Sequence, residues 1–248
     1  MGIVYVQTQD GTPLQLIRDR TLEEYCKHFR HQGDDLVTIL LKLAQVKDTV
    51  AFYDIGCGEG CVAKSLHENL KERAERLGLD GDLANKVTYI GMDLECGNYW
   101  VASDKKKFYR GDILDILKEN SAQLPPIDLG VSLFVFPYIS RKLETLEALI
   151  KMLNRGDGLG ILLIEPFNNH QLVFLDGSEE RPLTVAESLS GGFEIIYPNG
   201  SELRLVAKRG ETTPLNVNLA KTECDFWQFS KGGLIGYPGQ KISYYQRV

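Results

Sequence analysis

Three glycines at alternate positions follow an acidic residue in the first third of the chain, where the segment from Asp54 to Gly60 reads DIGCGEG. Glycine accepts backbone conformations that other residues avoid, so this segment can turn sharply and let a ligand lie against bare main chain. The apolar run at residues 50–53 predicts a buried strand before the turn. The pattern from Cys61 onward predicts a helix, whose unpaired N–H groups would face the ligand.

The spacing of these glycines favours a ligand with an ammonium group over a dinucleotide. A dinucleotide fingerprint, G-x-G-x-x-G, needs its third glycine at the position of Cys61, whereas the third glycine here is Gly60. The carboxylate of Asp54, directly ahead of the loop, would repel a pyrophosphate and attract an ammonium group. We therefore do not expect this loop to bind a nicotinamide dinucleotide.

Two further acids follow the next two predicted strands. Asp93 ends the strand expected at residues 87–92, and its carboxylate can accept hydrogen bonds from both hydroxyls of a ribose. Asp112 follows the strand expected at residues 108–110 and could accept from an adenine amino group, with Ile113 covering the ring. Taken alone, Asp112 is explained equally well as a helix N-cap.

Together, and in this order, these residues resemble the class I S-adenosylmethionine-dependent methyltransferases, a family with a Rossmann-like fold. The resemblance covers about residues 46–206 and implies S-adenosylmethionine as cofactor. It implies that the glycines approach the methionine portion, and that Ser132 faces the methyl-transfer site from the strand expected at residues 127–135. The residues that it implies contact the cofactor are Asp54, Gly56, Cys57, Gly58, Gly60, Asp93, Leu94, Asp112, Ile113 and Ser132.

One departure from the family lies between the glycine loop and Asp93, where the chain is longer than usual. The extra sequence, residues 71–85, is charged and contains glycine. We expect it to extend the helix and to continue as a surface loop.

Tyr138 and His170 are the candidate catalytic residues. Many small-molecule O-methyltransferases place a histidine after the fourth strand, but this chain has Pro137 there, which weakens a histidine-base mechanism. Tyr138 could present its hydroxyl or its ring to the acceptor, or simply pack under the next helix. His170 follows the strand expected at residues 159–164, at the rim where family members often bind substrate, although a loop histidine without a visible partner is more often a surface residue. A base is needed only when the acceptor must lose a proton.

The elements that position these residues alternate regularly between strand and helix. This pattern predicts an α/β fold with a doubly wound, mainly parallel seven-stranded sheet. A C-terminal antiparallel hairpin (residues 193–197 and 203–207) would lie at its edge, and cap helices would occupy residues 14–46, with a break at Gly33. We expect an N-terminal helical cap at residues 1–48, the cofactor domain at 49–210, and an extension at 211–248 that packs on it.

The composition of the chain limits the kinds of partner and cellular location that we expect. The net charge of −6 argues against a strong binder of nucleic acid, because that affinity depends largely on lysine and arginine. The five cysteines show no paired C-x-x-C spacing, so we expect neither disulfides nor a metal site, and a cytoplasmic location. No segment predicts a signal peptide or a membrane span. The oligomeric state stays open.

These observations predict methyl transfer to a small-molecule acceptor, at nitrogen or oxygen. One alternative is a methyltransferase acting on RNA or protein. However, the Asn-Pro-Pro-Tyr-like signature expected of many such enzymes after the fourth strand is absent. Another alternative is a non-catalytic methyltransferase-like binding protein. The intact glycine loop and acids speak against lost cofactor binding, though not against a lost acceptor site.

Overall fold

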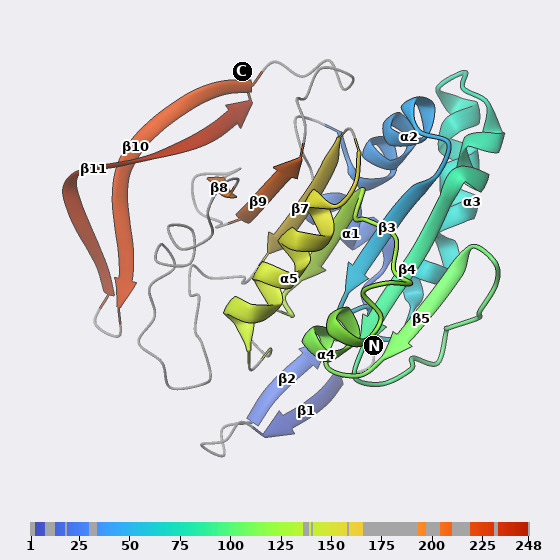
Figure 1. The fold of residues 1–248 in the computed structure, drawn as a ribbon, viewed down its shortest axis with the longest axis horizontal. Helices are drawn as coiled ribbons and strands as arrows, with labels where there is room; N and C mark the ends of the chain where they lie inside the picture. The colour runs from blue at the N-terminus through green and yellow to red at the C-terminus, as the bar shows by residue number, and fades with distance from the viewer. Residues whose placement is uncertain are drawn as a thin grey trace.

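The sheet at the centre of the protein places five parallel strands side by side (Figure 1). The computed structural model describes residues 3–7, 13–17, 19–29, 34–135, 139, 141–157, 159–165, 193–196, 204–209, 219–230 and 233–247. In their order across the sheet, the parallel strands are β5 (Lys106–Arg110), β4 (Val87–Asp93), β3 (Val50–Ile55), β6 (Leu129–Leu133) and β7 (Gly160–Glu165).

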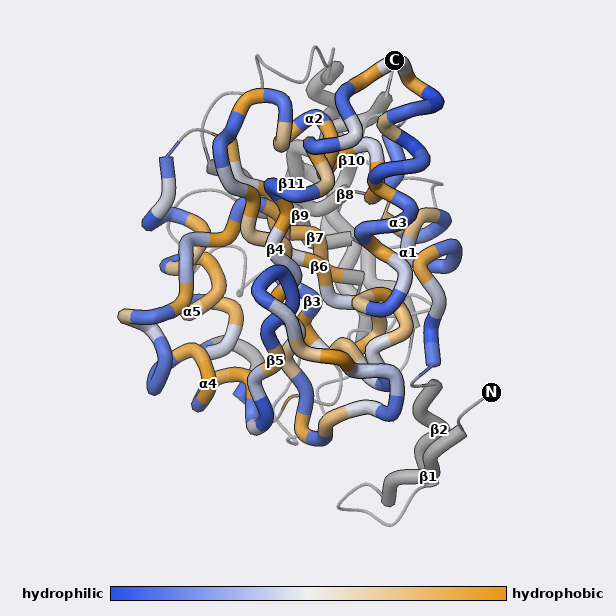
Figure 2. Tube along the Cα trace, turned by 90° about the vertical axis from the view of Figure 1, so that its right-hand side faces the viewer, coloured by the Kyte–Doolittle hydropathy of each residue, from blue (hydrophilic) through white to orange (hydrophobic). Residues whose placement is uncertain are grey.

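Helices cover both faces of this sheet, and the strands divide their side chains between two apolar clusters. Along β3, Val50 and Phe52 join one cluster, whereas Tyr53 and Ile55 join the other, as the two-residue period of a strand requires. The hydrophobic colour in Figure 2 accordingly runs along the central strands. The first cluster includes residues of α2 (Leu36–Val46) and α3 (Cys61–Arg76), and the second includes residues of α4 (Ile113–Glu119) and α5 (Lys142–Asn154). The predicted α/β class and the parallel, doubly wound arrangement are confirmed.

The strand order reverses beside β3. The chain leaves β3 through α3 and adds β4 and then β5 on one side, whereas β6 and β7 lie on the other side. Loops that follow β3 and β6 therefore diverge to opposite faces at their carboxyl ends. In open α/β sheets, ligands bind at this switch point.

The N-terminal segment differs from the expected helices. Residues 14–17 lie in strand β2 (Pro13–Ile17), which pairs antiparallel with β1 (Ile3–Gln7). The alternation of apolar and polar residues in this segment has the period of a strand, and the helical prediction overlooked it. Helix α1 (Leu22–His28) begins only at the capping box of Thr21 and Glu24. The predicted break at Gly33 lies outside the described residues.

The long connection between the glycine loop and Asp93 contains no inserted strand. Helix α3 continues to Arg76, and the 3-10 helix η1 (Gly81–Lys86) leads directly into β4. The expected extension of the helix is confirmed, and the expected surface loop contains this 3-10 helix. Asp93 therefore ends the strand that neighbours β3, as its assignment requires.

The C-terminal part adds antiparallel strands, described here by their backbone. β9 (Arg204–Arg209) pairs with β7 and with β8 (Phe193–Ile196). β10 (Leu219–Ser230) and β11 (Gly233–Arg247) form a two-stranded sheet of their own (Figure 1). The expected domain boundaries stay predictions. Among the described residues, no helix is both long enough and apolar enough to cross a membrane.

Candidate ligand-binding site

The glycine loop turns at the carboxyl end of β3 in a conformation that other residues rarely adopt. Gly56, Gly58 and Gly60 have φ angles of 81°, 57° and 81°, all in the left-handed region. The backbone N–H groups of Gly56 and Cys57 both donate to the carbonyl of Met92, at 2.8 and 3.1 Å, which ties the loop to β4. The alternate glycines are thus required by the backbone, as the sequence indicates.

Gly56 also lies against the loop that follows β6. A Cβ atom on Gly56 would come within 2.2 Å of a Val135 methyl carbon, well inside van der Waals contact. The two loops that diverge at the switch point therefore touch at this glycine. A side chain here would force them apart.

Replacing Gly56 with alanine is expected to destabilise the fold by more than the usual cost of a left-handed alanine, about 1–2 kcal/mol. Gly78→Ala is the matched control, because Gly78 has φ 69° and nothing within 4 Å of an added Cβ. Chemical denaturation of both variants measures the difference. A Val135→Ala change in the Gly56→Ala background should restore part of the loss. Equal losses at Gly56 and Gly78 would show that the Val135 contact contributes nothing.

Asp93 lies at the end of β4, where the sequence places it, and its carboxylate holds the glycine loop. Oδ2 accepts from the backbone N–H of Gly58 at 2.9 Å, and Oδ1 lies 3.4 Å from the backbone nitrogen of Glu95. The residue is only partly buried. A carboxylate in this position both shapes the loop and stands at the surface where a ligand would bind.

Asp54 is placed differently from the expectation that its carboxylate faces an ammonium group. The residue is fully buried, and its two oxygens accept hydrogen bonds from the hydroxyls of Tyr25 and Tyr89, at 2.9 and 2.5 Å. The pKa of Asp54 is raised to about 7, mainly because burial disfavours the charged carboxylate; the hydrogen bonds from Tyr89 and Tyr25 oppose this rise, and the nearby Asp93 adds to it. Asp54 therefore ties α1 and β4 to the base of the loop.

The segment after β4 crosses the glycine loop. The backbone and side-chain nitrogens of Asn98 both donate to Glu59 Oε2 at 2.8 Å, and the N–H of Tyr99 donates to the Glu59 carbonyl at 2.9 Å. Gly97 lies so close to Glu59 that a Cβ would approach its backbone to 2.2 Å. Leu94, an expected cofactor contact, is 68% exposed at the start of this segment. Residues 94–99 thus form a rim beside the loop.

Helix α3 begins at a glycine, which has no side chain to cap the first backbone N–H groups. Gly60 is its N-cap, no side-chain cap hydrogen bond is made here by the described residues, and the first turn contains no acidic residue. A 16-residue helix with such an end favours an anionic group there. Cys57, by contrast, is buried and packs its sulfur against Gly91, and burial raises the pKa of its thiol. It serves as a small packing residue of the loop.

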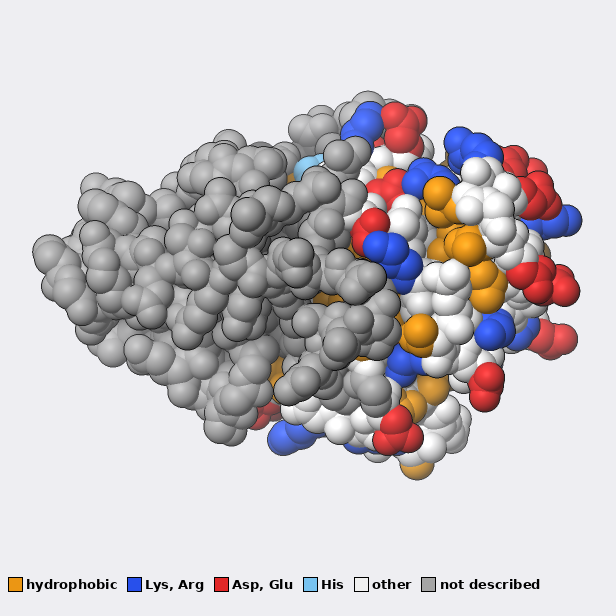
Figure 3. Space-filling view, turned by 90° about the horizontal axis from the view of Figure 1, so that it is seen from above, with side chains coloured by type: hydrophobic (Ala, Val, Ile, Leu, Met, Phe, Trp, Pro, Cys, Tyr) orange, Lys and Arg blue, Asp and Glu red, His pale blue; other side chains and the backbone are white. Residues whose placement is uncertain are grey.

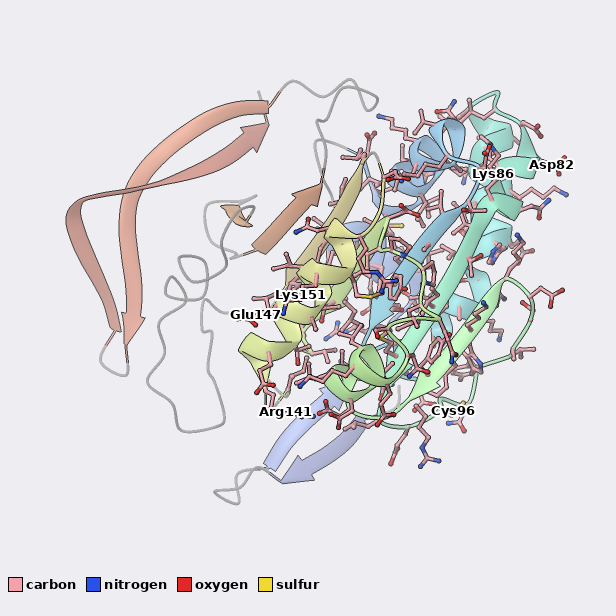
Figure 4. The ribbon with its side chains drawn as sticks, in the orientation of Figure 1. Asp82, Lys86, Cys96, Arg141, Glu147 and Lys151 are labelled. Atoms are coloured by element: carbon pink, nitrogen blue, oxygen red, sulfur yellow. The ribbon has the colours of Figure 1, made fainter. Side chains whose placement is uncertain are left out.

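Asp112 follows β5 and is the N-cap of α4. Its Oδ1 lies 3.0 and 3.4 Å from the backbone nitrogens of Leu114 and Asp115, and it accepts from the Arg141 guanidinium at 2.9 Å. Figure 4 shows Arg141 at the same end of the sheet as Cys96, which follows β4. The helix-cap interpretation of Asp112 is therefore observed. Ile113 is buried in the second apolar cluster.

Of the remaining predicted site residues, the structure describes Ser132 but not Tyr138 or His170. Ser132 is fully buried one residue before the end of β6, and its hydroxyl finds no hydrogen-bond partner among the described residues. Its neighbours Val131 and Leu133 belong to the first apolar cluster, so alternation puts Ser132 on the opposite face. Tyr138 and His170 lie outside the described residues. Within the described part, no group of three histidine, cysteine or acidic residues could hold a metal ion.

The site also contains aromatic residues whose contacts the sequence does not predict. The hydrogen bond from Tyr25 to Asp54 joins residues far apart in the chain. Trp100 lies between the rings of Tyr89 and Phe108, at centroid distances of 5.6 and 5.2 Å, and its backbone lies near Gly60. Only the aromatic character of these residues was visible in the sequence, and it does not specify a partner.

Comparison with known proteins finds distant similarities only. No protein-family model matches the chain, and no curated protein matches it. Among solved structures, it is similar to an S-adenosylmethionine-dependent methyltransferase from Aquifex aeolicus (14% identity, 76% of this chain and 98% of that one, TM-score 0.42). It is also similar to the trans-methyltransferase CalH in complex with SAH (15% identity, 75% of this chain and 58% of that one, TM-score 0.47). A third similar structure is precorrin 8W decarboxylase from Methanobacterium thermoautotrophicum (13% identity, 84% of this chain and 86% of that one, TM-score 0.38). At such low identities and TM-scores, the case for a function rests on the residues of the site.

Proposed function

We propose that this protein binds S-adenosylmethionine at the switch point beside β3 and transfers its methyl group to a small-molecule acceptor. The observation that carries the proposal is the left-handed glycine loop at the end of β3, held by the carboxylate of Asp93 from the end of β4. A bare loop and a partly exposed acid on adjacent parallel strands suit a nucleoside with a ribose diol.

The residues present fit this cofactor. The uncapped start of α3 would take its carboxylate, and the loop from Gly56 to Gly60 would lie along its methionine portion. Asp93 would bind the ribose, with Leu94 beside it. We propose Asp112 and Ile113 for the adenine, although the cap and the Arg141 ion pair already engage the Asp112 carboxylate.

When bound, S-adenosylmethionine would supply a methyl group activated by its positively charged sulfur, and an acceptor lone pair would bond to the methyl carbon as the C–S bond breaks and leaves its electrons on the sulfur of SAH. What the chain must add is alignment of the acceptor, and good positioning can supply up to roughly 7–11 kcal/mol of a barrier. In this proposal, the buried tie of Asp54 to Tyr25 and Tyr89 fixes α1 and β4 around the loop. Tyr138 and His170 stay candidate contacts of the acceptor.

The charge of the chain supports the proposal that the acceptor is a small molecule. The chain carries a net charge of −6, and basic and acidic side chains interleave on the described part of the face in Figure 3. A nucleic-acid surface would gather lysine and arginine. We further propose that β9 and β8 complete a seven-stranded sheet whose antiparallel edge supports the acceptor side.

The experiment is an assay of SAH formation from S-adenosylmethionine, with cell extract divided into small-molecule, protein and RNA fractions. We expect turnover with the small-molecule fraction. Turnover with only the protein or the RNA fraction would show that the acceptor is a protein or an RNA instead of a small molecule. For RNA, an electrophoretic band shift that weakens steeply with salt should accompany the turnover. Cofactor binding without turnover on any fraction would favour a non-catalytic binding protein.

A further inference from the structure

Phe134 adopts a strained backbone directly after β6. Its φ of 57° is the only positive value among the described residues other than glycine. A bulky residue in this region is held there by its surroundings, and such strain often accompanies a ligand site. Two side chains from the N-terminal segment contact its ring: the Arg20 guanidinium lies 4.7 Å from the ring centroid, and the His28 ring meets it edge-on at 5.1 Å.

Arg20 is a largely buried cation without a close acceptor in the described part of the chain. Its side chain is 16% exposed, and the nearest carboxylate oxygen of a described residue, on Glu24, is 3.9 Å away. The other oxygen of Glu24 accepts from the backbone N–H of Thr21 at 2.7 Å as part of the capping box. A guanidinium has five N–H donors, which need acceptors when they are buried, and the described residues supply no close carboxylate. An oxyanion from a ligand would satisfy them.

We propose that Arg20, lying over Phe134, binds a carboxylate or phosphate group of the acceptor. This inference rests on the proposed function and names the class of acceptor as anionic. The guanidinium fork recognises both oxyanions through paired hydrogen bonds. The uncapped start of α3 already offers donors for the carboxylate of the cofactor, which leaves Arg20 for a second anion. Its place beside the end of β6 puts that anion at the switch point.

The test is calorimetric titration of the SAH-saturated protein with benzoate and with inorganic phosphate, which separates the two oxyanions. Arg20→Met should weaken the better-bound anion at least about tenfold, since it removes charge-assisted hydrogen bonds. Arg20→Lys should fall between Arg20→Met and the wild type, because it keeps the charge without the fork. Arg76→Met is the matched control: it removes an exposed arginine at the far end of α3 and should change nothing. Thermal unfolding of each variant confirms that it is folded.

Two results would overturn the proposal. One is anion binding that is absent from the wild type, or equal in the wild type and Arg20→Met. The other is a tenfold loss of SAH affinity in Arg20→Met with unchanged binding of 5′-methylthioadenosine, which lacks the carboxylate; Arg20 would then hold the cofactor. A wild type that binds no SAH would instead refute the proposed function. The same anion titration of the cofactor-free protein would then decide the role of Arg20 separately.

Discussion

Replacing Asp93 with alanine is expected to weaken SAH binding at least about tenfold. The change removes two charge-assisted hydrogen bonds to the ribose, each worth about 1.5–3 kcal/mol. It also frees the backbone N–H of Gly58 from its 2.9 Å hydrogen bond, so the loop loses its anchor. The cofactor-free protein should lose only about 1–2 kcal/mol of stability, because the backbone N–H groups of Gly58 and Glu95 that lose this acceptor lie in partly exposed loops. Calorimetry and thermal unfolding measure the two effects.

Asp93→Asn should bind with intermediate affinity, since the amide oxygen still accepts one hydrogen bond. Asp82→Ala is the matched control, because this exposed acid lies in η1 at the opposite end of the sheet from Cys96 and Arg141 (Figure 4). Unchanged SAH affinity in Asp93→Ala would mean that another acid, such as Glu95, binds the ribose. A large loss of stability without cofactor would make Asp93 a structural residue.

Replacing Asp54 with alanine is expected to lower the free energy of unfolding by at least about 2 kcal/mol. The hydroxyls of Tyr25 and Tyr89 would each lose a buried acceptor, at about 1–3 kcal/mol for each unsatisfied group. Denaturant titration measures the loss, and the Tyr25→Phe variant tests the share of one hydroxyl. A change below about 0.5 kcal/mol would mean that the carboxylate does not hold these elements together.

The same carboxylate should make stability depend on pH. Burial raises the pKa of Asp54 from 3.8 to about 7 in the folded protein, so the folded state binds more protons than the unfolded state between these values. Stability therefore falls as pH rises through this window, by roughly a few kcal/mol, because each tenfold change in a proton-binding constant corresponds to about 1.4 kcal/mol. Asp54→Asn cannot titrate, so the wild type should lose stability relative to this variant from about pH 4 to pH 7. Parallel profiles would contradict the raised pKa.

The sequence predicts the framework of the site because its signals are local. Strand periodicity, the glycines from Gly56 to Gly60 and the acid after each strand define β3, β4 and β5 and place Asp93 correctly. The errors arise where two local patterns compete. Residues 14–17 follow a strand period although the longer segment to residue 46 predicts helices, and the capping box at Thr21 marks where the first helix starts.

What the sequence could not predict depends on contacts between distant residues. The ammonium partner expected for Asp54 follows from charge alone, whereas its burial beneath Tyr25 and Tyr89 depends on how α1 packs against the sheet. Likewise, the strained Phe134 and the Arg20 above it are adjacent only in the folded chain. Residue type signals a possible role, but the fold selects the partner.

Calorimetric titration of the wild-type protein with S-adenosylmethionine and SAH, beside NAD⁺ as a dinucleotide control, tests the central claim most directly. We expect saturable one-to-one binding of S-adenosylmethionine and SAH, competition between them, and no heat from NAD⁺. The glycine loop, its carboxylate anchor and the uncapped start of α3 lead to this result. Binding of NAD⁺, or the absence of binding by both S-adenosylmethionine and SAH, would contradict the account.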